Sequence, residues 1–203
     1  EKSNYMSDTQ VASWYGDIGA MIVDQYAKCE EAESYFTEAY NVYKNLPVTY
    51  RPTDSYTEVL TLARCYVNDG NTIKANYFLK VALQNAVLST NSNKNFYVAH
   101  IDLNQARVYF LEEKYQTAYN YMGMSSLNIF KDVNKLSHTL DPQTISEYIR
   151  DYIILYENLE SMGFDMTKFK NYLEIEAIKN RITSNRRLDQ MKIDSTKKNM
   201  EKL

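Results

Sequence analysis

The chain has 203 residues, of which 24% are charged and 44% hydrophobic, and its formal net charge is −3. It contains only 5 Gly and 3 Pro, the residues that supply the backbone angles of β-turns, so helices are favoured over a multi-stranded β fold. The composition is not that of a disordered chain. The sequence also lacks the run of about 18 apolar residues that a membrane span requires.

Capping residues and apolar spacing predict the helices in chain order. Ser7, Ser55, Asn71 and Asp165 are good N-cap residues, and Asp141 precedes a proline at a first helical position. Between these sites apolar residues recur at three and four, the period of an amphipathic helix. The sequence therefore predicts eight helices, over 8–26, 29–46, 55–69, 72–89, 94–112, 115–130, 142–161 and 165–198.

Small residues recur in three sets at a fixed period of 43 residues. Small residues at fixed sites on paired helices let two backbones approach closely, while a large residue fills the groove beside them. The pattern therefore predicts a repeat of helix pairs. The sets are Ala20, Ala63 and Ala106; Ala32, Ala75 and Ala118; and Ala39, Ala82 and Ser125, with Phe36, Leu79 and Met122 as the large residues.

The segment 62–83 resembles a tetratricopeptide (TPR) repeat. Ala63 and Tyr66 stand at the small and aromatic positions of the first helix, Gly70 at the turn, and Ala75, Leu79 and Ala82 at the second-helix positions. Further copies look to be carried by Ala106, Tyr109, Tyr115, Ala118, Met122 and Ser125, and more weakly by Ala20, Val23, Ala32, Phe36 and Ala39. The period of 43 exceeds the usual unit of about 34 residues, which implies longer helices and loops.

This resemblance covers roughly residues 10–130 and implies an all-α fold. Residues 1–164 are expected to form a TPR-like, right-handed superhelical array of antiparallel helix pairs, with three clear units and a degenerate fourth. Residues 165–203 are expected to form a long C-terminal helix, docked at first and then continuing as a basic linker. TPR arrays often bind peptides on a concave face lined by the first helix of each pair. The implied groove residues are Trp14, Thr57, Arg64, Asn68, His100, Leu103, Arg107 and Leu111.

Two arginines and the only tryptophan carry the most specific expectations for this groove. Arg64 and Arg107 occupy the same place in successive units, so together they would suit a carboxylate on a bound chain. The alternative is that each pairs with an acid of its own protein, such as Asp102 or Glu58. Trp14 is expected either to pack at the N-terminal end or to act as a binding hot spot.

Catalysis has little support in the sequence. The histidines, His100 and His138, stand in no catalytic or phosphate-binding motif, so we expect no enzymatic activity, no cofactor and no metal site.

Cys29 and Cys65 are too few for a zinc site. We expect plain buried thiols, with a disulfide or a reactive cysteine as open alternatives. The helical tyrosines are expected to be half-buried contacts between helices.

The mean charge conceals an acidic body and a basic tail. Residues 1–176 carry 15 Lys+Arg and 23 Asp+Glu, whereas residues 177–203 carry 8 and 3. The acidic body opposes nucleic-acid binding, but the tail could bind nucleic acid or an anionic membrane. Self-association through the C-terminal helix is a further option. The basic residues of the tail include Arg181, Arg186, Arg187, Lys192, Lys197 and Lys198.

This layout loosely resembles the TPR signalling proteins of Bacteroidetes-type bacteria, in which a TPR region leads through a helical linker to a membrane span and an effector module. The leading prediction is a non-catalytic scaffold that binds a peptide or partner protein, as the sensory part of a signalling or transcriptional regulator. The alternative is a regulator that associates with nucleic acid or membrane through its basic helix. The compartment is left open between the cytoplasm and the periplasmic part of a larger membrane-anchored protein.

Overall fold

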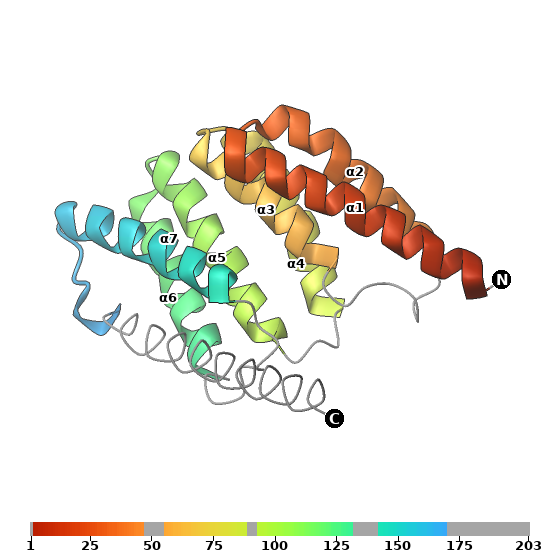
Figure 1. The fold of residues 1–203 in the computed structure, drawn as a ribbon. Coiled ribbons are helices and arrows are strands. Elements are labelled where there is room, and N and C mark those ends of the chain that lie inside the picture. Colours follow the sequence, from red (N-terminus) through yellow and green to blue (C-terminus); the bar gives the residue numbers. More distant parts are fainter. Residues whose placement is uncertain (1, 47–54, 89–92, 132–141, 170–203) are drawn as a thin grey trace, which may run out of the picture.

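The computed structural model describes residues 2–46, 55–88, 93–131 and 142–169, and within these ranges it consists of helices without a strand (Figure 1). The predicted all-α class is therefore confirmed for the described residues. The helices are α1 (Lys2–Tyr26), α2 (Cys29–Asn45), α3 (Ser55–Asn68), α4 (Thr72–Leu88), α5 (Lys94–Leu111), α6 (Tyr115–Lys131), α7 (Pro142–Ser161) and the short 3-10 helix η3 (Thr167–Phe169).

Six of these helices form three pairs, α1–α2, α3–α4 and α5–α6, which pack side by side in chain order (Figure 1). Each pair turns at a residue with positive φ: Ala27 (51°), Gly70 (77°) and Glu113 (60°). These positions are 43 residues apart, so the backbone repeats with the same period as the alanines. The hydrogen bonds that end the first helices repeat too, from the Asn71 N–H to Tyr66 O and from the Lys114 N–H to Tyr109 O, each at 2.9 Å.

The small residues of the repeat lie inside the helical layers. Only Ala20, in the first helix, is partly rather than fully buried. The large residues between them are buried as well, with Phe36, Leu79 and Met122 each at most 2% exposed. The small residues therefore allow close helix contacts, as the sequence predicts. Those with no exposed surface are Ala32, Ala39, Ala63, Ala75, Ala82, Ala106, Ala118 and Ser125.

The two cysteines correct an expectation. Cys29 and Cys65 form a disulfide, with their Cα atoms 5.6 Å apart, whereas the sequence favoured plain buried thiols. The bond joins the first residue of α2 to α3, and so ties the first helix pair to the second. Their spacing of 36 residues gave no hint of this pairing, because only the packing of two successive pairs brings the two sulfurs together.

The fourth unit departs from the register of the other three. The turn after α7 lies at Gly163 (φ 86°), seven residues later than the period places it. α7 nevertheless packs on the array, and its Tyr148 hydroxyl lies 2.8 Å from Ser125 Oγ of α6. The Tyr152 hydroxyl pairs with Ser126 Oγ at 2.8 Å and also donates to the Phe169 carbonyl at 3.0 Å. The chain thus folds back onto α6 at η3.

The two ends of the chain differ from the predicted helix limits. α1 runs through Ser7, which was predicted as its N-cap, and begins at Lys2 because neither Gly nor Pro interrupts the intervening residues. Asp165 caps a 3-10 turn rather than an α-helix, since its Oδ1 accepts bonds from the Thr167 N–H (3.0 Å) and hydroxyl (2.7 Å). The rest of the helix predicted over 165–198 lies outside the described residues.

The helical tyrosines are more varied than the half-buried contacts that were predicted. Tyr35, Tyr40, Tyr119 and Tyr121 are half-buried, as expected. Tyr77 is 63% exposed on α4. The buried ones are Tyr43, Tyr66, Tyr97, Tyr148, Tyr152 and Tyr156.

Candidate functional site

Five of the eight predicted groove residues fall at two repeated positions of the first helices, and we call the face that these positions define the first-helix face. Two positions define it at the 43-residue period: Trp14, Thr57 and His100 at one, and Met21, Arg64 and Arg107 at the other. The Thr57 side chain lies outside the described residues. The remaining side chains show that this face has two different parts, one over α3 and α5 and one on α1.

Over α3 and α5 the two arginines converge on one carboxylate. Asp151 Oδ2 of α7 lies 3.0 Å from Arg64 Nε and 3.1 Å from Arg107 Nη1. Arg64 also donates through Nη1 to Glu147 of the same helix. The arginines therefore pair with acids of their own protein, although with acids other than Asp102 and Glu58. α7 thus occupies the place that the sequence assigned to a bound peptide.

This cluster of charges is buried and electrically balanced. Asp151 and Arg64 are 1% and 7% exposed. Burial alone would raise the pKa of Asp151, but the charges of Arg64 and Arg107 outweigh it and hold the pKa well below its usual range. Burial would likewise lower the pKa of Arg64, but Asp151 and Glu147 raise it. Asp151 and Arg64 thus stay charged in a site from which water is largely excluded.

His100 lies beneath this cluster and does not line an open groove. It is 1% exposed, and its Nε2 is 3.8 Å from Asp151 Oδ2, too far for a hydrogen bond. Neither ring nitrogen has a hydrogen-bond partner among the described residues. Burial lowers the pKa of the imidazole, so the ring is neutral and packs edge-on against Tyr148 at 5.5 Å.

The other predicted residues are divided between core and surface. Leu103 has no exposed surface and belongs to the core, which corrects its assignment to a groove. Asn68 accepts a hydrogen bond of 2.6 Å from Arg107 Nη2 and so supports the arginine cluster. Leu111 is 47% exposed. Trp14 is 63% exposed, so it does not pack at the N-terminal end as expected.

On α1 the first-helix face is apolar and uncovered by described residues. Trp14 and Met21 are 63% and 46% exposed, and Val11 and Ile18 beside them are each 37% exposed. This spacing of three and four places them in one stripe along the helix. An exposed apolar stripe of this kind marks an interaction surface more often than an isolated exposed side chain does.

Acidic groups border the stripe on α1. Asp17 and Asp24 are exposed on the same helix. Burial and the nearby Glu147 raise the pKa of Asp24, against the opposing effect of Arg64 and Arg150. The stripe is therefore apolar along its centre and negatively charged along the edge that carries Asp17 and Asp24.

Sequence reasoning missed the two residues of α7 that complete the site, Glu147 and Asp151. The shifted register of the fourth unit hid them, because the 43-residue period assigns them no partner. One pattern could have revealed Asp151: it lies on the apolar face of its helix, next to Tyr148, Tyr152 and Leu155 at helical spacing. An acid at such a position needs a buried cation.

The fold and this site define an all-α protein of repeated helix pairs. Comparison with known proteins adds nothing to that class: no family model matches the chain, and no curated protein or solved structure is similar enough to count as a match. Among the described residues, no group of three or more His, Cys, Asp or Glu side chains is placed to hold a metal ion. No helix in the described ranges is long and apolar enough to cross a membrane. The predicted basic tail lies outside the described residues.

Proposed function

We propose that this chain is a non-catalytic, TPR-like superhelical scaffold that binds a peptide or partner protein on the α1 part of its first-helix face. In this proposal the chain is the sensory part of a bacterial signalling or transcriptional regulator. The observation that carries the binding role is the exposed stripe around Trp14 and Met21. The repeat supports the TPR assignment through the 43-residue spacing of Ala27, Gly70 and Glu113, the residues of positive φ at the turns.

The structure itself offers an example of what this face accommodates. α7 lies over the equivalent positions of α3 and α5 and presents a carboxylate to their arginines. On α1 the same position is Met21, and the flanking charges are Asp17 and Asp24. A partner helix for α1 would therefore present apolar side chains at its centre and Lys or Arg at one edge.

Truncation of the stripe tests the proposal. Trp14→Ala combined with Met21→Ala should abolish capture of the partner, because central apolar anchors contribute most of the binding energy of such contacts. Ile73→Ala combined with Val87→Ala is the matched control, since these side chains of α4 are also exposed (83% and 53%). Affinity capture from the source cell, followed by mass spectrometry, compares the three proteins.

The proposal fails if the α1 double variant captures the same proteins as the wild type while circular dichroism shows both folded. A candidate partner can then be followed through Trp14, the only tryptophan of the chain. Its fluorescence should shift to shorter wavelength when the partner covers the stripe, because the indole leaves water.

A further inference from the structure

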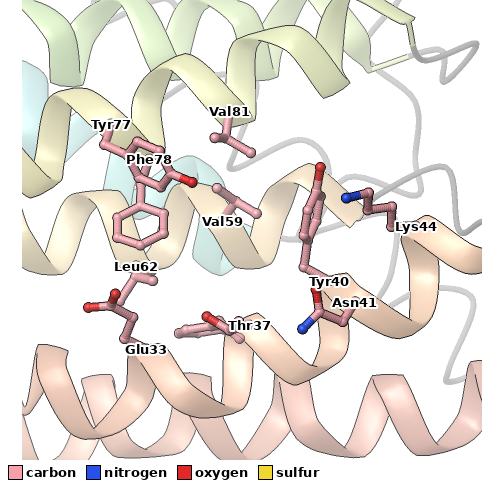
Figure 2. Close-up of a pocket in the computed structure, with 11 residues that line it drawn as sticks. Glu33, Thr37, Tyr40, Asn41, Lys44, Val59, Leu62, Tyr77, Phe78 and Val81 are labelled. Carbon is pink, nitrogen blue, oxygen red and sulfur yellow. The ribbon is translucent and has the colours of Figure 1, made fainter.

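A second candidate site lies away from the first-helix face, between two second helices. A groove of about 520 Å³ runs between α2 and α4 with α3 as its floor. We call it the α2–α4 groove. Figure 2 shows Thr37, Tyr40 and Asn41 on its α2 wall and Tyr77 and Phe78 on its α4 wall. Its volume is in the range of small-molecule sites in proteins.

The repeat provides an internal reference for this groove. One period later, a smaller hollow of about 320 Å³ lies between α4 and α5, beside Tyr121 of α6. Its polar groups bond to one another, with Gln105 donating to Asn76 at 2.6 Å and Asn128 donating to Asp102 at 2.8 Å. In the α2–α4 groove the positions of Gln105 and Asp102 are held by Leu62 and Val59.

Three polar side chains of the α2–α4 groove lack a hydrogen-bond partner among the described residues. Among the described residues, Thr37, Tyr40 and Asn41 have no side-chain hydrogen bond. Glu33 at one end receives bonds from Tyr66 and from Lys74 (2.9 Å), and both go to its Oε2 atom. Its Oε1 atom faces no donor in the described ranges. Compared with the hollow one period later, this groove thus offers a hydroxyl, a phenol, an amide and a carboxylate oxygen to a ligand.

The opposite wall has a different character. Tyr77 is 63% exposed and meets Phe78 edge-to-face at 5.0 Å. Phe78 in turn stacks on Tyr66, with ring centroids 5.8 Å apart and planes at 6°. The aromatic rings are therefore held in place by their neighbours before any ligand arrives. Rigid rings on one wall and unpaired polar groups on the other require a ligand with one apolar face and one polar edge.

We propose that the α2–α4 groove binds a neutral carbohydrate chain. A pyranose ring has apolar C–H faces that can stack on Tyr77 and Phe78, and hydroxyl groups at its edge that can both donate and accept. Thr37 and Asn41 can do the same from the α2 wall.

Two other ligand classes fit the groove less well. Burial would raise the pKa of Glu33, but the bonds from Tyr66 and Lys74 outweigh it and lower the pKa, so one end of the groove carries a charged carboxylate. Lys44 lines the other end (Figure 2), so a ligand of either charge that fills the groove would meet a like charge at one end. An extended peptide exposes N–H and C=O groups along both of its edges. The wall formed by Tyr77, Phe78 and Val81 offers only one hydroxyl to the second edge.

Calorimetric titration with defined probes tests the proposal. The probes are soluble oligosaccharides of β-1,4-glucose, α-1,4-glucose, xylose and N-acetylglucosamine, together with an extended peptide of alternating Thr and Tyr. At least one oligosaccharide should bind, and Tyr77→Ala and Asn41→Ala should each weaken it at least tenfold. Both side chains are exposed, so their truncation leaves the core intact.

Matched variants one period later separate the groove from general surface effects. Asn120 and Gln84 lie one period after Tyr77 and Asn41. Asn120→Ala and Gln84→Ala should therefore leave carbohydrate affinity unchanged. The proposal is overturned if none of the oligosaccharides binds at millimolar concentration, if all four variants bind equally, or if only the peptide binds. None of these variants touches the α1 stripe, so the outcome is independent of the partner-binding proposal.

Discussion

The first helix pair and the two that follow share a backbone repeat but differ on the first-helix face. Over α3 and α5 this face carries Arg64, His100 and Arg107, which α7 covers. On α1 the corresponding residues are Met21 and Trp14, which are 46% and 63% exposed. The comparison shows that one structural position can either be covered by another helix of the protein or stay exposed, depending on the side chains placed there.

The difference also concerns how each pair is attached to its neighbours. The second and third pairs are joined by packing and by the buried ions that α7 contributes. The first pair is joined to the second by the Cys29–Cys65 disulfide. One period later the same two positions are Thr72 and Val108, so this covalent link occurs at the first junction and cannot occur at the second.

The largest expected effect is the loss of the carboxylate that α7 contributes. Asp151→Ala should lower the free energy of unfolding by about 3–5 kcal/mol, because it leaves Arg107 buried without a counter-charge and removes one of the two acids that pair with Arg64. Urea denaturation measures the change. Glu157→Ala, an exposed acid on the same helix, is the control and should cost less than about 0.5 kcal/mol. Equal losses in the two variants would show that α7 is not held by this cluster.

The disulfide is expected to contribute nearly as much, but at the first pair. It closes a loop of 36 residues, for which the chain-entropy relation gives about 4 kcal/mol. Replacing both Cys29 and Cys65 with Ser should lower the free energy of unfolding by that amount. Denaturation of the wild type with and without a reducing agent measures the same quantity. Superimposable curves would contradict the prediction, and the double variant should not respond to reductant.

A smaller effect should depend on pH and should distinguish the third pair from the second. Burial raises the pKa of Asp102 to about 6, partly opposed by the hydrogen bond from Asn128, whereas the second pair has Val59 at this position. Since the folded-state pKa exceeds the unfolded value of about 3.9, the favourable contribution of Asp102 is complete below pH 4 and is lost as the pH rises through 6.

Asp102→Asn removes this titration while keeping an acceptor for Asn128. Relative to the wild type, the variant should gain about 2 kcal/mol in free energy of unfolding between pH 4 and pH 7. His100, whose pKa burial lowers, changes stability in the opposite direction over part of this range. It is present in both proteins, so it cancels in the difference. A difference that is constant with pH would contradict the prediction.

The smallest effect concerns the three turns that share one backbone conformation. Gly70 adopts positive φ without cost, whereas Glu113 (60°) adopts it against the preference of a residue with a Cβ atom. Glu113→Gly should therefore raise the free energy of unfolding by up to about 1 kcal/mol, and Gly70→Ala should lower it by about 1 kcal/mol. Thermal unfolding measures both. Changes of the same sign in the two variants would show that φ does not decide stability at these turns.

The sequence predicts the helices and their repeat well because these depend on local patterns. Buried alanines at a fixed spacing and N-caps such as Asn71, whose Oδ1 accepts from the Lys74 N–H at 3.1 Å, act within one or two helices. The positive φ angles of Ala27 and Glu113 at their turns were not predicted. The packing of the neighbouring helices imposes these angles, and the side chains of Ala27 and Glu113 do not favour them.

The site is less predictable because it is assembled from distant parts of the chain. The sequence identified Arg64 and Arg107 as a pair that would hold a carboxylate of a bound chain, with an acid of the same protein as the alternative, and the structure shows the alternative. It did not identify the acid, since Asp151 follows Arg64 by 87 residues and reaches it only through the position of α7. The same reason applies to Cys29 and Cys65, whose contact depends on how two helix pairs pack.

Whether the disulfide forms also depends on the compartment in which the protein folds. In a compartment that keeps thiols reduced, Cys29 and Cys65 would remain separate and the first pair would be attached by packing alone. In an oxidising compartment the Cys29–Cys65 disulfide would join the first two helix pairs covalently. Alkylation of protein taken directly from the cell, followed by mass measurement, distinguishes the two histories. The proposed partner surface on α1 would then belong to a covalently attached first pair or to one attached by packing alone, according to the compartment in which the chain folds.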